Sequence, residues 1–221
     1  MALVIFDCDG VLVDSEVILI AAELEFLARA GLDFDRADYM RRFLGMPQQA
    51  WEDALHDLLL AQSGKGFEPN FFQDLKEFAW QRFEKELTEV AGARGVIESL
   101  EPAVCVASSS TSSSMRWKLD HTGLLDLFDP HLFSAEHVEH GKPAPDLFLL
   151  ASERMGVAPS DCIVIEDSCN GVIGAKRAGM KAIGFTGGGH CMDDHGEALR
   201  AEGADAVVES HDALAKVIET F

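Results

Sequence analysis

The sequence predicts an α/β fold, a doubly wound parallel sheet of the Rossmann-like kind with an inserted all-helical domain. Short, continuously apolar runs recur along the chain, with helix-length segments between them. Such runs are typical of strands buried on both faces of a parallel sheet, whereas exposed antiparallel strands alternate. In a long stretch at about residues 15–87 no strand is apparent. A helical module therefore interrupts the alternation of strands and helices.

The predicted strands share this apolar character and lie at residues 3–6, 103–107, 132–134, 162–165, 182–185 and 206–208. The segments between them carry helix signals. Ser168 precedes a helix predicted over 170–178, which Gly179 ends. Gly156 ends another helix, predicted over 147–155. The strand–helix order predicts an open, doubly wound sheet.

The inserted stretch contains amphipathic patterns that predict four helices, at residues 16–30, 35–44, 47–62 and 70–86. Gly31 and Gly45 separate the first three. The strand–helix alternation resumes near Gly95. We therefore predict an α/β core made of residues 1–14 and 88–221, and a helical cap domain over residues 15–87.

Composition excludes several classes of protein. The 18 Lys and Arg against 38 Asp and Glu give a net charge of −20, which disfavours a nucleic-acid partner because phosphate backbones require a basic surface. The apolar runs are too short to span a membrane, and we expect no signal peptide, because the first residues show no basic n-region or small-residue cleavage site. The five cysteines form no CxxC pair. We expect a cytoplasmic protein, a monomer or weak homodimer without membrane partners.

Polar residues follow four of the predicted strands. Ligands of doubly wound sheets bind at the carboxyl ends of the strands, so these residues are candidates for one site. Crowded carboxylates repel one another unless a cation lies among them, and Mg²⁺ prefers oxygen ligands. The site therefore suits Mg²⁺ and a phosphate group. Its candidates, in strand order, are Asp7 and Asp9, Ser108, Lys142, and Glu166 and Asp167.

Four segments resemble, in order, the motifs of the haloacid dehalogenase-like hydrolases. The first reads Phe6-Asp7-Cys8-Asp9-Gly10-Val11-Leu12-Val13-Asp14-Ser15-Glu16. The others are residues 106–108, 141–146 and 165–171. Together they span nearly the whole chain, and the helical insertion lies where that family's cap belongs. The chain is most similar to the helical-cap subgroup that includes sugar-phosphate phosphatases and β-phosphoglucomutase.

The resemblance implies roles for these residues. It implies that Asp7 is the nucleophile of an aspartyl-phosphate mechanism and that Asp9 is the general acid and base. Ser108 and Lys142 would bind the phosphate, together with the backbone amides of Cys8, Asp9 and Ser109. The implied Mg²⁺ ligands are Asp7, Asp9, Glu166 and Asp167. Cys8 lies between two carboxylates, which disfavours a thiolate role.

Asp9 favours phosphate ester hydrolysis, because a leaving alkoxide needs a proton and a leaving halide does not. The phosphomutases with this cap carry a histidine early in the first cap helix, whereas residues 17–20 are aliphatic here. A phosphatase is therefore the leading hypothesis, and a hexose phosphomutase is the alternative. A dehalogenase is disfavoured, as is a phospho-acceptor module, which would have no use for a helical cap.

Two further segments carry candidate binding residues. The loop around Gly45 resembles the family's substrate-specificity loop, and with few basic residues it suits a small sugar phosphate or sugar-acid phosphate. Its candidates are Arg42, Gly45, Met46 and Gln48, although Arg42 also suits a solvated helix face.

The glycine-rich loop at residues 187–189 leads to His190, a candidate for contact with substrate or cap. The run His190-Cys191-Met192-Asp193-Asp194-His195 also invites a zinc interpretation. The sequence supplies no second ligand pair, so an ordinary loop is favoured there.

Overall fold

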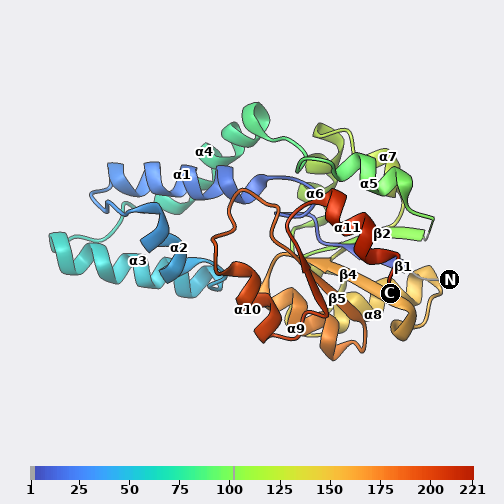
Figure 1. Cartoon of the computed structure of the whole chain (residues 1–221). Helices are drawn as coiled ribbons and strands as arrows, with labels where there is room; N and C mark the ends of the chain where they lie inside the picture. Colours follow the sequence, from blue (N-terminus) through green and yellow to red (C-terminus); the bar gives the residue numbers. More distant parts are fainter. Residues whose placement is uncertain (1–2, 102) are drawn as a thin grey trace. The chain divides into compact units, whose positions relative to one another are not determined.

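The structure, a computed structural model, describes residues 3–101 and 103–221 and contains two compact units (Figure 1). The core unit ends its first segment at Glu16 and resumes at Leu87. The helical unit spans Val17–Glu86. In the core unit the outgoing and returning segments lie side by side, because Asp14 N donates to Thr88 O and Val90 N donates to Leu12 O, at 3.1 and 2.9 Å.

The core unit is built on a parallel sheet with the order β3-β2-β1-β4-β5-β6. Its strands are β1 Leu3–Phe6, β2 Ala103–Ser108, β3 Leu132–Ser134, β4 Cys162–Glu166, β5 Lys181–Phe185 and β6 Ala206–Val208. This confirms the predicted fold class, and every predicted strand lies within one residue of an observed one. The chain reverses its winding direction between β1 and β4, so their carboxyl ends form the expected ligand-binding edge.

Helices cover both faces of this sheet (Figure 1). One face packs on α8 Asp146–Met155, α9 Cys169–Arg177 and α10 His195–Ala201, with Leu3 and Ile5 in the shared core. The other face is covered by α5 Ala93–Ser99, α6 Ser112–His121, α7 Leu125–Phe128 and α11 His211–Ile218. Phe6 meets Phe128 there edge-on, with ring centroids 6.0 Å apart. The short 3₁₀ helices are η1 Ala135–His137 and η2 Pro159–Asp161.

The helical unit has an aromatic core of its own. Its helices are α1, which begins in the core unit, α2, α3 and α4, at Ser15–Arg29, Arg36–Phe43, Gln48–Ser63 and Phe71–Glu86. Phe71 stacks on Phe67 with ring centroids 4.1 Å apart. Trp51 Nε1 donates to the Tyr39 hydroxyl, which donates to Glu23, both at 2.9 Å. Aromatic pairs and satisfied polar tips both stabilise such packing.

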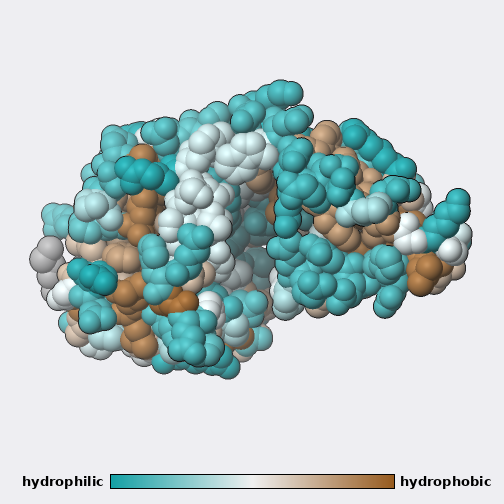
Figure 2. All heavy atoms as spheres, turned by 180° about the vertical axis from the view of Figure 1, so that it is seen from behind, coloured by the Kyte–Doolittle hydropathy of each residue, from teal (hydrophilic) through white to brown (hydrophobic). Residues whose placement is uncertain are grey.

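Hydrophilic residues cover most of the face in Figure 2, and hydrophobic residues appear there in scattered patches. Single exposed apolar side chains are normal on protein surfaces. Among the described residues, the helices are all too short or too polar to cross a bilayer.

Candidate active site

Three charged side chains meet at the carboxyl ends of β1 and β4. Asp7 directly follows β1, Glu166 ends β4, and Lys142 comes from the loop before α8. Lys142 Nζ donates to Asp7 Oδ1 and Glu166 Oε1, both at 2.5 Å, and to Ala107 O at 2.9 Å. The side chains of Lys142, Asp7 and Glu166 are 4%, 10% and 1% exposed. One lysine therefore bridges two buried carboxylates.

Asp167 completes an acidic cluster, defined here as Asp7, Glu166 and Asp167. Each of these buried residues offers one carboxylate oxygen, and the three oxygens lie within 4.8 Å of one another. Gly10 makes this approach possible: its φ is +77°, and a Cβ there would overlap the Asp167 carboxylate. The cluster fits Mg²⁺, because its donors are all oxygens and their charge exceeds that of Lys142.

The pKa shifts of the acidic cluster indicate that Lys142 does not fully offset its negative charge. Burial raises the pKa of Asp7 well above its usual value, and the neighbouring carboxylates add to this rise against the opposing effect of Lys142. Burial and Glu166 likewise raise the pKa of Asp167. Burial alone would lower the pKa of Lys142, but Asp7 and Glu166 raise it, so Lys142 is a cation. A bound divalent cation would relieve the remaining repulsion.

Mg²⁺ should raise the melting temperature, and the increase should be larger at higher pH. Because the folded-state pKa values of Asp7 and Asp167 are raised, the metal-free protein loses stability as pH rises from about 4 through those values. Mg²⁺ binds the deprotonated carboxylates and restores that stability. At 100 times its Kd it contributes about 2.7 kcal/mol, equivalent to an increase of about 5–10 °C. Thermal melts with Mg²⁺ and with EDTA at several pH values measure this.

Asp167→Asn should shrink the Mg²⁺-induced increase, because the variant removes one anionic ligand. Asp161→Asn is the matched control, since Asp161 is exposed in η2. Equal increases in the two variants would contradict a metal site at the acidic cluster.

Asp9 lies in a separate polar cage. Its Oδ1 accepts from Lys118 Nζ and Ser15 Oγ, both at 2.5 Å, and its Oδ2 accepts from Ser110 Oγ at 2.7 Å. Burial alone would raise the pKa of Asp9, but Lys118 and the three hydrogen bonds hold it below its usual value. Asp9 is therefore ionised at neutral pH and held in one orientation.

Lys118 was not among the sequence candidates, although a signal for it was present. It lies on α6, next to Met115 and Leu119 on the buried side of that helix. A lysine on the apolar face of a helix is rarely buried without a charged partner. That pattern indicates that a carboxylate contacts Lys118, but only the folded chain identifies this carboxylate as Asp9.

Lys118→Met should reduce catalysis by about 10–100-fold, because Asp9 loses the cation that holds its carboxylate in one orientation. The pKa of Asp9 should then rise, which moves the limb of the pH–rate profile that Asp9 controls to higher pH. Lys176→Met is the matched control, since Lys176 pairs with Asp205 at a more exposed position. An unchanged pH–rate profile in Lys118→Met would contradict this role for Lys118.

Glu16 is a second residue that the sequence candidates did not include. Burial, followed by the charges of Asp9 and Asp167, raises its pKa to about 7. Glu16 is thus an additional carboxyl group whose charge depends on Asp9 and Asp167. Its place in the first motif suggested no specific role.

The other core-unit candidates occupy different positions around the strand ends. Ser108 is buried at the end of β2 and its Oγ accepts from Ser110 N, while Ser109 is exposed. Cys8 is fully buried, and burial raises its thiol pKa, as expected for a residue without a thiolate role. His190 Nε2 lies 3.0 Å from Asp167 Oδ2. The structure thus brings His190 to the acidic cluster.

The remaining candidates, Arg42, Gly45, Met46 and Gln48, belong to the helical unit, at the end of α2 and the start of α3. All four are exposed. The Arg42 guanidinium lies over the Phe43 ring, 5.2 Å from its centroid, and Gln48 donates to Glu52 at 2.7 Å. Their role in substrate binding stays a prediction.

Comparison with known proteins supports the motif-based resemblance. The phosphorylated carbohydrates phosphatase of Thermotoga maritima is 34% identical over 217 residues, which cover 97% of each chain. A conserved haloacid dehalogenase-like protein of Agrobacterium tumefaciens has a solved structure with a TM-score of 0.90 at 33% identity, covering 100% of this chain and 98% of that chain. The structure of a putative β-phosphoglucomutase from Thermotoga maritima has a TM-score of 0.81 at 31% identity, covering 100% of this chain and 99% of that chain.

A family model also matches most of the sequence. It describes haloacid dehalogenase-like hydrolases and covers residues 1–179, which include the four motifs, the whole helical unit and most of the core unit. The chain therefore belongs to the haloacid dehalogenase-like hydrolases.

Proposed function

We propose that this hydrolase is a Mg²⁺-dependent phosphatase that cleaves a small phosphate monoester through an aspartyl-phosphate on Asp7. The observation that carries the proposal is the pairing of a buried Asp7–Lys142–Glu166 bridge with a second, separately held acid, Asp9. This arrangement supplies a nucleophile and a proton carrier two residues apart. The relative named as a phosphorylated carbohydrates phosphatase supports the same reaction class.

In the first half-reaction, a carboxylate oxygen of Asp7 attacks phosphorus and the bond to the leaving alkoxide breaks. Asp9 gives the alkoxide its proton. Asp9 is ionised without substrate, and the negative phosphate beside it raises its pKa, which favours the protonated form needed for this step. In the second half-reaction, Asp9 takes a proton from water as the water attacks phosphorus, and the bond to Asp7 breaks.

Lys142 orients Asp7 for this attack. Lys142 fixes Asp7 Oδ1 by a 2.5 Å hydrogen bond and offsets its charge, so that an anionic phosphate can approach. Mg²⁺, held by the acidic cluster and by Asp9 through its backbone carbonyl, would supply further positive charge and polarise the phosphoryl oxygens. Ser108 and the backbone amides of Cys8, Asp9 and Ser109 would bind the transferring oxygens.

A small substrate fits this chain better than a large polyanion, because the net charge is −20. We assign the choice among sugar phosphates and sugar-acid phosphates to the exposed segment that contains Arg42, Gly45, Met46 and Gln48. In this assignment residues 15–87 act as the cap domain and the remaining chain as the catalytic core.

Phosphate release from a panel of small sugar phosphates and sugar-acid phosphates tests the proposal. Release with Mg²⁺ that stops with EDTA is the expected result, and the order of rates across the panel identifies the substrate class. An isomeric sugar phosphate without free phosphate would overturn the phosphatase in favour of a phosphomutase. No product from any substrate, with the protein folded, would also contradict the proposal.

A further inference from the structure

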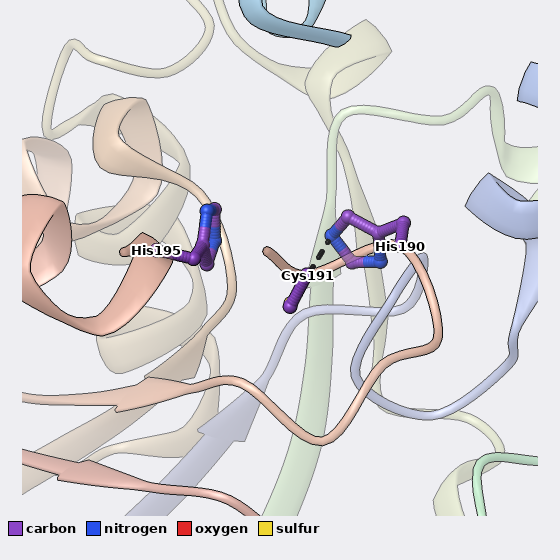
Figure 3. A group of neighbouring side chains, drawn as sticks. All are labelled: His190, Cys191 and His195. Atoms are coloured by element: carbon purple, nitrogen blue, oxygen red, sulfur yellow. Dashed lines mark hydrogen bonds between the residues drawn. The ribbon is translucent and has the colours of Figure 1, made fainter. Parts of the chain in front are cut away.

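The segment between β5 and α10 brings together three side chains that bind soft metal ions (Figure 3). His190, Cys191 and His195 each offer one ligand atom, and these atoms lie within 4.8 Å of one another. Cys191 Sγ is 3.6 Å from His190 Nε2, and the two imidazole centroids are 5.9 Å apart. Figure 3 shows Cys191 between the two imidazole rings.

These separations suit a tetrahedral zinc site. With Zn–N bonds of about 2.0–2.1 Å and Zn–S bonds of about 2.3 Å, two ligand atoms of a tetrahedron lie about 3.5 Å apart. The 3.6 Å between Cys191 Sγ and His190 Nε2 matches this value. His195 offers its ligand atom within 4.8 Å of the other two, so a bound Zn²⁺ would draw it closer. Three protein ligands leave the fourth position open.

The surrounding structure holds these ligands in place. His195 Nε2 donates to the backbone oxygen of Asp167 at 2.5 Å, which leaves Nδ1 with the lone pair that a metal needs. His190 is only 3% exposed, and Gly188 beside it has no room for a side chain. A Cβ at Gly188 would lie 2.6 Å from Gly10 O and 2.9 Å from the His190 ring. Asp14 Oδ1 also accepts from Gly189 N at 3.1 Å.

The donor set distinguishes this cluster from the acidic cluster. A thiolate and two imidazoles prefer Zn²⁺, whereas three carboxylates prefer Mg²⁺. The sequence favoured an ordinary loop because it supplies no second ligand pair. The structure shows that the three ligands nonetheless lie together, since a turn in which His195 N donates to Met192 O at 3.0 Å brings the third ligand to the first two.

We propose that His190, Cys191 and His195 bind one Zn²⁺ ion, and that its occupancy slows the phosphatase reaction. The link between the two sites is the 3.0 Å contact of His190 Nε2 with Asp167 Oδ2. Zn²⁺ on His190 breaks or reorients that contact and attracts the Asp167 carboxylate away from the acidic cluster. The inhibitory part rests on the proposed phosphatase function, whereas the binding part does not.

Cobalt spectroscopy of the full chain with excess Mg²⁺ tests the binding. Co²⁺ in the proposed site should give tetrahedral visible bands and a thiolate-to-cobalt charge-transfer band, and one equivalent of Zn²⁺ should remove both. Cys191→Ser should lose the charge-transfer band and weaken Zn²⁺ binding by at least about 100-fold. Cys169→Ser is the matched control, because Cys169 is a half-buried thiol outside the three-residue group, and it should keep both.

Absence of the charge-transfer band in the wild-type protein, or its persistence in Cys191→Ser, would overturn the site. Inhibition is read separately, as Zn²⁺-dependent loss of phosphate release that Cys191→Ser relieves. Equal Zn²⁺ inhibition of Cys191→Ser and wild type would overturn the inhibitory link. Failure of the proposed phosphatase is distinguishable, because it would abolish phosphate release without changing the cobalt spectrum.

Discussion

Asp7→Asn should lower Mg²⁺-dependent phosphate release by about 10⁴-fold or more, because an amide cannot attack phosphorus as a carboxylate does. Asp7 contacts Lys142 directly and lies in the acidic cluster, so its charge is central to the proposed reaction. Single-turnover phosphate release from the best substrate of the panel measures the loss. A variant with near wild-type rates would end the aspartyl-phosphate mechanism.

The same substitution should leave the melting temperature of the metal-free protein unchanged or higher. Burial raises the folded-state pKa of Asp7, so its ionisation costs stability as pH rises above the unfolded-state value of about 3.9. Asparagine has a similar shape and never carries that charge. Asp33→Asn, at an exposed position, is the control and should keep full activity. A large drop in melting temperature for Asp7→Asn alone would show that lost activity reflects unfolding.

Lys142→Met should have the second large effect, on stability and activity together. Lys142 is the cation that bonds both Asp7 and Glu166, and all three side chains are buried. Removing one partner of a buried ion pair costs about 3–5 kcal/mol, because the remaining charges are left uncompensated. For a chain of this length that lowers the melting temperature by about 6–20 °C. Phosphate release should fall by at least about 10²-fold, since the phosphate loses an electrostatic partner.

The loss of stability in Lys142→Met should depend on pH. Lys142 opposes the rise in the pKa of Asp7, so without Lys142 that pKa rises further and Asp7 binds a proton over a wider range. The difference from wild type should therefore be largest at high pH and should shrink as pH falls toward about 4. Mg²⁺ should restore part of the stability. Lys176→Met is the control, and equal destabilisation of the two variants would contradict this account.

Much of the fold follows from local sequence patterns. A continuous apolar run such as Leu3–Phe6 suits only a strand covered on both faces, and it lies in the middle of the observed sheet. Glycines end helices such as α8, where Gly156 adopts the left-handed conformation. The register of a parallel sheet then places the residues after β1 and β4 at one edge. For this reason the sequence predicts that Asp7 and Glu166 meet at this edge, with Lys142 expected from the segment that follows β3.

Contacts that depend on helix rotation or loop path could not be predicted in this way. Lys118 reaches Asp9 because the side of α6 that carries Lys118 is buried. The two residues are 109 positions apart in the sequence, and that separation does not predict their contact. The His190–Asp167 contact depends on how the glycine-rich loop returns to the strand ends.

The sequence by itself determined the strand order along the chain, the inserted helical segment and the residues at the strand ends, because these depend on local patterns of apolar and polar residues. The tertiary structure decided the charge environment of each site residue, because pKa values depend on burial and on neighbours that are distant in sequence. It therefore separates two acids that lie two residues apart, with Asp7 in a crowded cluster that raises its pKa and Asp9 in a cage that lowers it.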